Sequence, residues 1–482
     1  MSDARSIPAR TTRAVLFICG LSVLFEGYDV GSLGAVLPAL AADRHWSLTP
    51  MELGALGSYA LAGMFFGGLA IGTLGDLLGR RRMLLGCVAL FSLTMAGAAL
   101  APTPFWFGLC RFLGGLGLGG VIPVAAALTI EYSPPARRSF NYGMMYSGYS
   151  LGILCAALVA MALLPAWGWR GVMAVGALPF LALVPMARAL PESLEYLAAR
   201  GRVDEARALA ARLGVTGELT VAQGSGSHQR ASLRDVVTAI FARRRLRATA
   251  CFWIALFCGM LLVYGLNTWL PMIMRKQGYA LGSSLAFLFV FSLTSACGGV
   301  LLGKLADRFG VRATVVLAYA IGALAIAALM TRNALFVSYA LVALAGIGSI
   351  SASLILTGHL THFYPAHARG AATGWALSFA RFGAMCGPLM GGYIASVGAD
   401  WSWNFVAFAV TGLVAALAVA ALPSRARVEA DIEAGEGGGA AQAQDQDQDQ
   451  DQDQDQDQDQ DQDQDQDYAR ARDATDRGAQ LS

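Results

Sequence analysis

Charged side chains are scarce in this sequence. Only 14% of its 482 residues are Asp, Glu, Lys or Arg, whereas 56% are hydrophobic. A soluble globular protein carries roughly 25% charged residues. Twelve of the 33 acidic residues lie in one alternating Asp-Gln segment, 445–467; outside it, 35 basic residues face 21 acidic ones. This composition excludes a disordered chain or a secreted disulfide scaffold, and it argues against a single soluble enzyme domain.

Patterns for disulfides, metals and cofactors are also missing. The five histidines have no metal-ligand spacing, and no phosphate-binding loop or nucleophile elbow occurs. We therefore expect no cofactor, no metal, no enzymatic activity and no nucleic-acid partner. All eight cysteines lie in hydrophobic runs, where a small apolar packing role suits them; they are Cys19, Cys87, Cys110, Cys155, Cys251, Cys258, Cys297 and Cys386.

Long hydrophobic runs are what the sequence does have. Each is near or above the roughly 20 residues that cross a hydrocarbon core as a helix, and helices satisfy their own backbone groups in lipid. The sequence therefore predicts an all-α membrane protein with twelve crossings. The runs are 14–40, 51–74, 83–101, 104–131, 140–165, 169–190, 248–271, 284–303, 313–331, 334–361, 370–397 and 402–422.

The first run has two competing interpretations. Arg10 and Arg13 precede it, as in a signal peptide. It is too long for one, however, and it contains Glu26 and Asp29, which a signal peptide's apolar region would exclude. We expect an uncleaved helix.

The basic residues predict the orientation. With the N-terminus in the cytoplasm, the inner segments carry 28 Lys and Arg and the outer loops five. Cytoplasmic loops of membrane proteins are enriched in Lys and Arg. We expect a bacterial inner (cytoplasmic) membrane protein with both termini in the cytoplasm.

The chain divides into two similar halves. We expect an N-terminal six-helix bundle (1–190), a polar cytoplasmic loop with short amphipathic helices (191–247), a C-terminal six-helix bundle (248–422) and a disordered cytoplasmic tail (423–482). At an offset of 231 residues, Gly, Asp, Pro and Arg positions recur. Parallel six-helix repeats are typical of secondary transporters with a site between the halves. The matching residues include Asp76, Gly79 and Arg81 with Asp307, Gly310 and Arg312, and Arg138 with Arg369.

Two loop motifs resemble the signature of the major facilitator superfamily. They are Gly72-Thr-Leu-Gly-Asp76-Leu-Leu-Gly79-Arg80-Arg81 and Gly303-Lys-Leu-Ala-Asp307-Arg308-Phe-Gly310-Val-Arg312. Glu131-x-x-Pro134, Arg137 and Pro191-Glu192-Ser193 look like inner-face motifs shared by sugar, organic-ion and aromatic-acid carriers. The resemblance covers about 1–422 and implies two pseudo-symmetric bundles that alternate access to one site.

A narrower resemblance involves three of the runs. Glu26-Gly27-Tyr28-Asp29 looks like the acidic-Gly-aromatic-Asp signature of the aromatic acid:proton symporters, although Asp is commoner at the first position. Arg111 and Arg381 stand where that family carries arginines. The resemblance implies proton-driven import of a small aromatic carboxylate.

Few ionisable residues lie deep in the runs, namely Glu26, Asp29, Arg111 and Arg381. A charge inside a membrane is costly, so it normally has a task. Glu26 and Asp29 cannot both ionise cheaply, so we expect one of them to carry the coupled proton. Arg111 and Arg381 could bind a substrate carboxylate as bidentate forks. The alternative is a static Asp29–Arg111 or Glu26–Arg381 pair that orients the helices.

Two further sets of residues are candidates. Hydrogen-bonding and aromatic residues could contact the substrate, or they could be membrane-interface anchors; they are Tyr28, Tyr264, Asn267, Trp269 and Trp375. The second set would switch the conformation, with Asp76–Arg138 and Asp307–Arg369 contacts holding the outward-open state. That set is Asp76, Gly79, Arg80, Arg81, Glu131, Arg138, Asp307, Arg308, Gly310, Arg312 and Arg369.

The sequence thus predicts a carrier that imports a small organic anion, of benzoate or hydroxybenzoate type, with protons across a lipid bilayer. We expect a functional monomer. A sugar or other organic-ion proton symporter remains the alternative, and a transporter-like receptor that does not transport is a further one.

Overall fold

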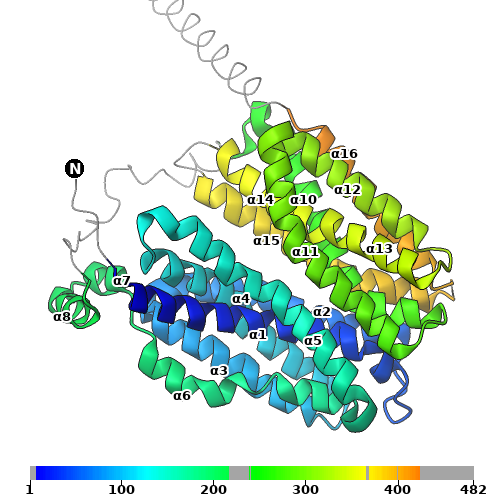
Figure 1. Cartoon of the computed structure of the whole chain (residues 1–482), viewed down its shortest axis with the longest axis horizontal. Helices are drawn as coiled ribbons and strands as arrows, with labels where there is room; N and C mark the ends of the chain where they lie inside the picture. Colours follow the sequence, from blue (N-terminus) through cyan, green and yellow to red (C-terminus); the bar gives the residue numbers. More distant parts are fainter. Residues whose placement is uncertain (1–6, 216–237, 239, 365–368, 399, 424–482) are drawn as a thin grey trace, which may run out of the picture. The chain divides into compact units, whose positions relative to one another are not determined.

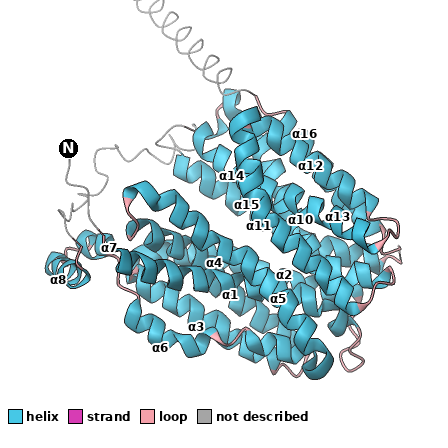
Figure 2. Cartoon of the chain, viewed as in Figure 1, coloured by secondary structure: helices cyan, strands magenta, loops and turns pink. Residues whose placement is uncertain are grey.

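The computed structural model describes residues 7–215, 238, 240–364, 369–398 and 400–423. For some of these, including Asp76 and Arg369, only the backbone is described. Every regular element within these ranges is a helix (Figure 2). The predicted disordered tail lies almost wholly outside the described residues.

The helices follow one another with short connections (Figure 1). The N-terminal half comprises α1 (Ala9–Ala41), α2 (Pro50–Leu78), α3 (Arg80–Ala99), α4 (Pro104–Glu131), the short 3-10 helix η1 (Pro135–Arg137), α5 (Arg138–Val175) and α6 (Pro179–Ala189). Two short helices follow, α7 (Leu194–Ala199) and α8 (Val203–Leu213). The C-terminal half comprises α10 (Arg243–Lys276), α11 (Leu281–Phe309), α12 (Val311–Ala328), α13 (Leu335–Gly346), η2 (Ile347–Ser351), α14 (Ala352–Phe363), α15 (Arg369–Ser396) and α16 (Trp403–Ala420).

Each of the twelve predicted crossings is helical. Ten helices of the described chain are long and apolar enough to cross a membrane. One of these spans, Phe140–Ala189, is 50 residues long, covers most of α5 and all of α6, and holds two predicted crossings. It is interrupted at Gly168, whose φ of 61° and ψ of −166° are not helical, and again between Val175 and Pro179. The predicted crossing 370–397 is α15, whose first residues have undescribed side chains.

The repeat predicted from the sequence is visible in the backbone. Gly79 precedes α3 with φ 100° and ψ 139°, and Gly310 precedes α12 with φ 85° and ψ 144°. A residue with a Cβ avoids this region of φ, so glycine is required at both turns. Two residues further on, Arg81 donates to the carbonyl of Ala187, and Arg312 donates to that of Ala420. The two halves therefore anchor their third and sixth crossings in the same way.

Among the described contacts, the two halves meet through α2 against α15 and α5 against α11, and α1 also contacts α10. Ser58 Oγ donates to the carbonyl of Met385 at 2.7 Å. A Cβ on Gly392 would lie 2.7 Å from the Pro50 carbonyl oxygen, and one on Gly34 would lie 1.9 Å from that of Asn267. The Gly392–Pro50 contact lies where α2 begins and α15 ends, and the Gly34–Asn267 contact joins α1 to α10.

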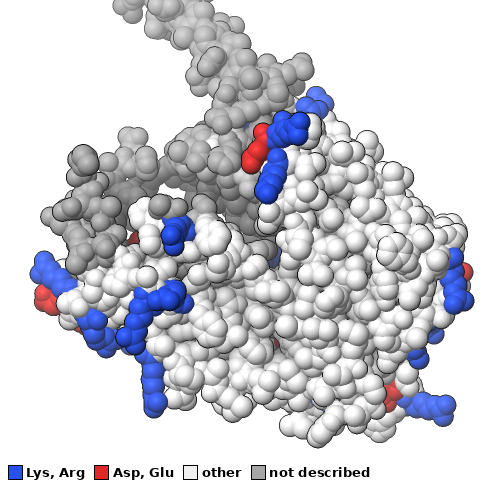
Figure 3. Space-filling view, in the orientation of Figure 1, with Lys and Arg blue, Asp and Glu red and all other residues white. Residues whose placement is uncertain are grey.

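The flanks of the helices are apolar and exposed. Phe336 is 83% exposed, Leu100 81% and Leu181 75%. In Figure 3 the middle of the helices is almost free of charge, and Lys and Arg gather toward the helix ends. Such a belt would aggregate in water and fits a lipid environment.

Candidate substrate and coupling site

Three of the four deep ionisable residues are buried in the N-terminal half. Glu26 and Asp29 lie on α1 and Arg111 on α4, and their exposed fractions are 1%, 2% and 3%. Arg381, on α15, is half-buried. Charges buried at this depth normally have a charged or polar partner or a functional role. The two acids differ in their partners.

Asp29 and Arg111 form a buried ion pair. Arg111 Nη1 donates to Asp29 Oδ1, and Nη2 donates to the Asp29 backbone carbonyl at 3.4 Å. Arg111 Nη1 also lies 3.5 Å from Met95 Sδ, while Nε has no hydrogen-bond partner among the described residues. The geometry is that of the static pair considered as the alternative, and it ties α1 to α4.

Glu26 has a different environment. Its Oε2 is buried without a hydrogen-bond partner in the described part of the chain. Arg381 and Asp29 lie within electrostatic range of it, although no ion pair with Glu26 is formed within 4.0 Å by the described residues. An unsatisfied buried carboxylate oxygen is rare in proteins and calls for a proton, an ion or a ligand group.

Arg381 joins the two halves. Its Nη1 donates to the carbonyl of Met64 on α2 at 2.8 Å, and its guanidinium lies against Gly68. A guanidinium has five N–H donors, and this bond uses one. Arg381 therefore keeps donors for a further acceptor at the place where the halves meet.

Tyrosine side chains from α5 and α10 lie in the same region as Glu26 and Arg381. Tyr149 on α5 donates its hydroxyl to that of Tyr264 on α10 at 3.0 Å. The Tyr146 ring stacks on Tyr149 with centroids 6.2 Å apart, and Tyr142 stacks on Tyr146 at 6.2 Å. Glu26 is within electrostatic range of Tyr146, Tyr149 and Tyr264. The cluster of Glu26, Arg381, Tyr146, Tyr149 and Tyr264 is called the central cluster below.

Sequence reasoning singled out Tyr264 but missed Tyr146 and Tyr149. Their spacing from Tyr142, four and then three residues, places all three on one face of α5. This spacing is the feature of the sequence from which the two tyrosines could have been predicted. A polar stripe on a helix otherwise apolar indicates a face turned away from lipid.

The remaining predicted substrate residues lie elsewhere. Tyr28 donates to the Val172 carbonyl at 2.7 Å, within the N-terminal half. Trp269 is fully buried and donates to the Pro388 carbonyl at 2.8 Å. Trp375 is 36% exposed and packs near Phe241. Asn267 is at the interface of the halves, 3.5 Å from the Val30 carbonyl, with its Oδ1 unpartnered among the described residues.

A second polar network lies where α3 begins and α4 ends. Glu131 accepts from Arg80 Nη1 at 3.0 Å, from Ser193 Oγ at 2.6 Å and from the Glu195 amide at 3.0 Å. Arg80 also pairs with Glu195 at 3.2 Å. Glu131 is 5% exposed, so these bonds satisfy a buried carboxylate.

Glu192 completes this network from the segment after α6. Its Oε1 accepts from the Arg81 amide at 2.9 Å and from the Ser193 amide at 3.0 Å. Tyr132 donates to the Glu192 backbone carbonyl. The Pro191-Glu192-Ser193 motif thus fastens α7 to the turn between α2 and α3.

A family model described as the Major Facilitator Superfamily matches residues 19–357 and 286–445. The chain belongs to the major facilitator superfamily. The family predicted from the loop motifs is confirmed, and so is the all-helical transporter fold.

Curated relatives of this superfamily member carry names of aromatic-acid carriers. It is 32% identical to a benzoate transport protein of Acinetobacter baylyi, over 85% of this chain and 89% of the relative. It is also 32% identical to a 4-hydroxybenzoate transporter of Pseudomonas aeruginosa, over 85% and 91%. A niacin transporter of Acinetobacter baylyi is 33% identical over 78% and 85%.

Solved structures of transporters share the fold. A D-xylose-proton symporter matches with a TM-score of 0.66 at 17% identity, covering 84% of this chain and 97% of that one. An inward-open xylose transporter from E. coli matches with a TM-score of 0.67 at 17% identity, covering 87% and 99%. At this identity the likeness shows the fold alone.

The superfamily loop residues are only partly described. The side chains of Asp76 and Arg369 lie outside the described residues, so the expected Asp76–Arg138 and Asp307–Arg369 contacts stay predictions. Arg138 and Asp307 are exposed, and Arg308 lies over the Phe309 ring, 5.2 Å from its centroid. What is described is the network of Arg80, Arg81, Glu131 and Glu192.

Replacing Glu131 with Gln is expected to loosen α7 and α8. The change removes the ion pair with Arg80 and weakens two hydrogen bonds to a charged acceptor, each worth about 1.5–3 kcal/mol. Thermolysin cleavage within 194–213, followed by mass spectrometry, should become at least about tenfold faster, because cleavage tracks the open population. Glu205→Gln, which removes an exposed pair with Arg202, is the control and should change little. Equal cleavage rates in both variants would contradict this role of Glu131.

Proposed function

We propose that this transporter imports a small aromatic carboxylate together with protons. The observation that carries the proposal is the central cluster, in which a Glu26 oxygen without a partner among the described residues lies within electrostatic range of the half-buried Arg381, where the two halves meet. The proposed substrate belongs to the benzoate and hydroxybenzoate type, as the names of the relatives suggest.

The arginine supplies the site for the carboxylate. A guanidinium fork binds a carboxylate bidentately and stays charged at every physiological pH. Arg381 has N–H donors left for a substrate carboxylate, whereas the Arg111 guanidinium is already paired with Asp29. We therefore assign the substrate carboxylate to Arg381 and a structural role in the resting state to the Asp29–Arg111 pair.

The tyrosines supply a place for the ring. Tyr146 and Tyr149 stack, and the Tyr149–Tyr264 hydrogen bond links α5 to α10. An aromatic substrate packed edge-to-face or offset on such rings gains about 0.5–1.5 kcal/mol per pair beyond area burial. A substrate bound here would touch both halves.

Coupling follows from the charge balance. A substrate carboxylate and an ionised Glu26 would both face Arg381, and two anions beside one cation in a low dielectric repel each other. Binding of the anion is therefore favoured when Glu26 carries a proton. Proton and substrate then cross together, and loss of the proton on the other side weakens the hold on the substrate.

Transport requires the site to be reached from each side in turn. The close contacts at Gly34, Ser58 and Gly392 lie at one end of the halves, where α2 begins. We propose that rocking of the N-terminal bundle against the C-terminal bundle separates these contacts. In this scheme the opposite end, with the α2–α3 turn and both termini, faces the cytoplasm of a bacterial inner membrane, and the unit of transport is a monomer.

The deciding experiment measures uptake by the purified protein in proteoliposomes. We expect accumulation of radiolabelled 4-hydroxybenzoate or benzoate when an inward proton gradient is imposed, and no uptake of glucose. Glucose uptake would favour the sugar symporter, and aromatic-acid uptake that ignores the gradient would reject coupling. Saturable ligand binding without any uptake would point to the receptor.

A further inference from the structure

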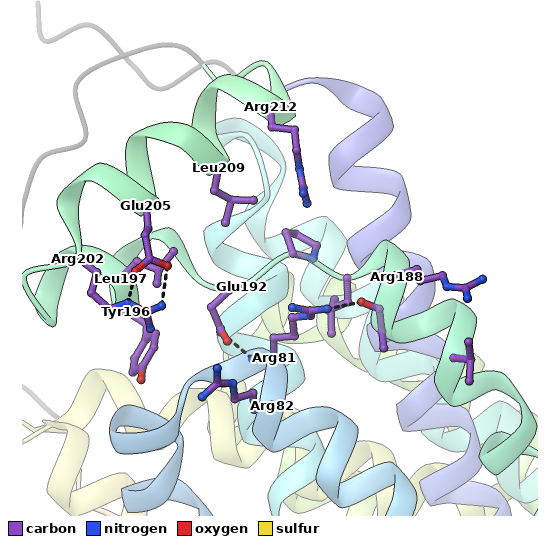
Figure 4. Close-up of a pocket in the computed structure, with 14 residues that line it drawn as sticks. Arg81, Arg82, Arg188, Glu192, Tyr196, Leu197, Arg202, Glu205, Leu209 and Arg212 are labelled. Atoms are coloured by element: carbon purple, nitrogen blue, oxygen red, sulfur yellow. Dashed lines mark hydrogen bonds and ion pairs between the residues drawn. The ribbon is translucent and has the colours of Figure 1, made fainter.

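A pocket of about 660 Å³ lies outside the central cluster, where α3 begins and α6 ends. Its walls come from α3, α6, the Pro191-Glu192 segment, α7 and α8 (Figure 4). Five arginines and two glutamates line it, and the rest of the lining is largely apolar. The charged residues are Arg81, Arg82, Arg188, Arg202, Arg212, Glu192 and Glu205.

The two glutamates are already engaged. Glu205 pairs with Arg202, with bonds of 2.6 and 2.7 Å. Glu192 accepts from two backbone amides, those of Arg81 and Ser193. Even with both carboxylates ionised, the five arginines of the pocket outnumber the two glutamates by three.

Positive charge is left over. In the described part of the chain, Arg82, Arg188 and Arg212 have no ion-pair partner. Arg81 binds the Ala187 carbonyl through Nη2, and its Nε is buried without a hydrogen-bond partner among the described residues. Figure 4 shows Arg212 reaching down from α8 toward Arg81. These groups suit an anion with several acceptor oxygens.

The apolar part of the pocket adjoins an exposed apolar surface of α6. Val184 of α6 lines the pocket and is 58% exposed, and Leu181, one turn earlier, is 75% exposed. Leu190 and Leu209 add apolar lining. A ligand that fills the pocket thus meets arginines at one end and exposed membrane-helix surface at the other.

We propose that this pocket binds the phosphate headgroup of an anionic phospholipid. Basic pockets beside transmembrane helices are suited to anionic headgroups, and the acyl chains would lie along α6. A bound phosphate would bridge Arg212 of α8 to Arg81 of α3. Because Arg81 also belongs to the network that fastens α7, the lipid would hold α7 and α8 against the bundle.

The test uses the full-length protein in detergent, titrated with phosphatidylglycerol and followed by native mass spectrometry. We expect one phosphatidylglycerol to be retained in preference to phosphatidylcholine. Arg188→Gln and Arg212→Gln should each weaken its binding about fivefold, as loss of one basic residue near a headgroup predicts. Two variants at separate helices guard against one that fails to fold.

The matched control is Arg207→Gln, also on α8 but outside the pocket. It removes the same charge and should leave phosphatidylglycerol binding unchanged. Equal weakening by Arg207→Gln would overturn the proposal in favour of diffuse surface charge. Water-soluble glycerol 3-phosphate should not displace the lipid at equal concentration; if it does, the site binds a soluble phosphate and the lipid assignment is wrong.

Discussion

Replacing Glu26 with Gln is expected to abolish proton-driven accumulation of the aromatic acid while leaving exchange of substrate across the membrane intact. A gradient of one pH unit is worth about 1.4 kcal/mol per proton, so the wild type could concentrate its substrate about tenfold with one proton. Glu26→Gln should bring the substrate only to equal concentrations inside and outside. Gln mimics the protonated acid, which is the form that accompanies the bound anion in the proposed cycle.

Two measurements separate this result from simple damage. Counterflow, in which unlabelled substrate inside exchanges for labelled substrate outside, should persist in Glu26→Gln because it needs no net proton movement. Asp204→Asn, which removes a fully exposed acid on α8, serves as the control and should accumulate substrate like the wild type. Accumulation by Glu26→Gln at the wild-type ratio would remove Glu26 from the coupling site.

The fold follows closely from the sequence for a physical reason. A bilayer accepts only helices whose backbone groups are satisfied internally, so apolar runs of sufficient length have few alternatives. The predicted run 104–131 and α4 have the same limits. The run 169–190 is less regular, because it spans the end of α5, a turn and α6. Length and hydropathy do not reveal such breaks.

The site is less completely determined by the sequence. Scarcity of charge marked Glu26, Asp29, Arg111 and Arg381, since each is costly in lipid. Which acid meets which arginine depends on helix packing: residues three apart point about 60° apart around a helix, enough to face different neighbours. In the structure Asp29 meets Arg111, and one oxygen of Glu26 has no partner among the described residues.

The role of the tyrosines is equally hard to predict from the sequence. Aromatic residues in a membrane helix are common as interfacial anchors and as packing groups, so their type alone does not mark a site. Tyr149 and Tyr264 come together although they are 115 residues apart in the sequence. Only the packing of α5 and α10 brings their hydroxyls together.

Breaking the Asp29–Arg111 pair is expected to destabilise the protein as well as stop transport. Each of Asp29→Asn and Arg111→Gln leaves one buried charge without its partner, which costs about 3–5 kcal/mol. Arg111→Lys keeps the charge but loses the fork that contacts both the carboxylate and the backbone of Asp29. Its loss of stability should be smaller. Unfolding by sodium dodecyl sulfate in mixed micelles, followed by tryptophan fluorescence, gives the free energies.

The double variant distinguishes a structural pair from two independent residues. Removing both charges leaves neither one unpaired, so Asp29→Asn with Arg111→Gln should cost less than the sum of the single changes. The exposed Arg202–Glu205 pair is the control, and its double-mutant cycle should show much weaker coupling than the buried pair. Additive losses at Asp29 and Arg111 would mean that the pair does not stabilise the α1–α4 contact. A double variant that folds yet transports like the wild type would confine both residues to structure and leave Arg381 and Glu26 as the whole of the coupling site.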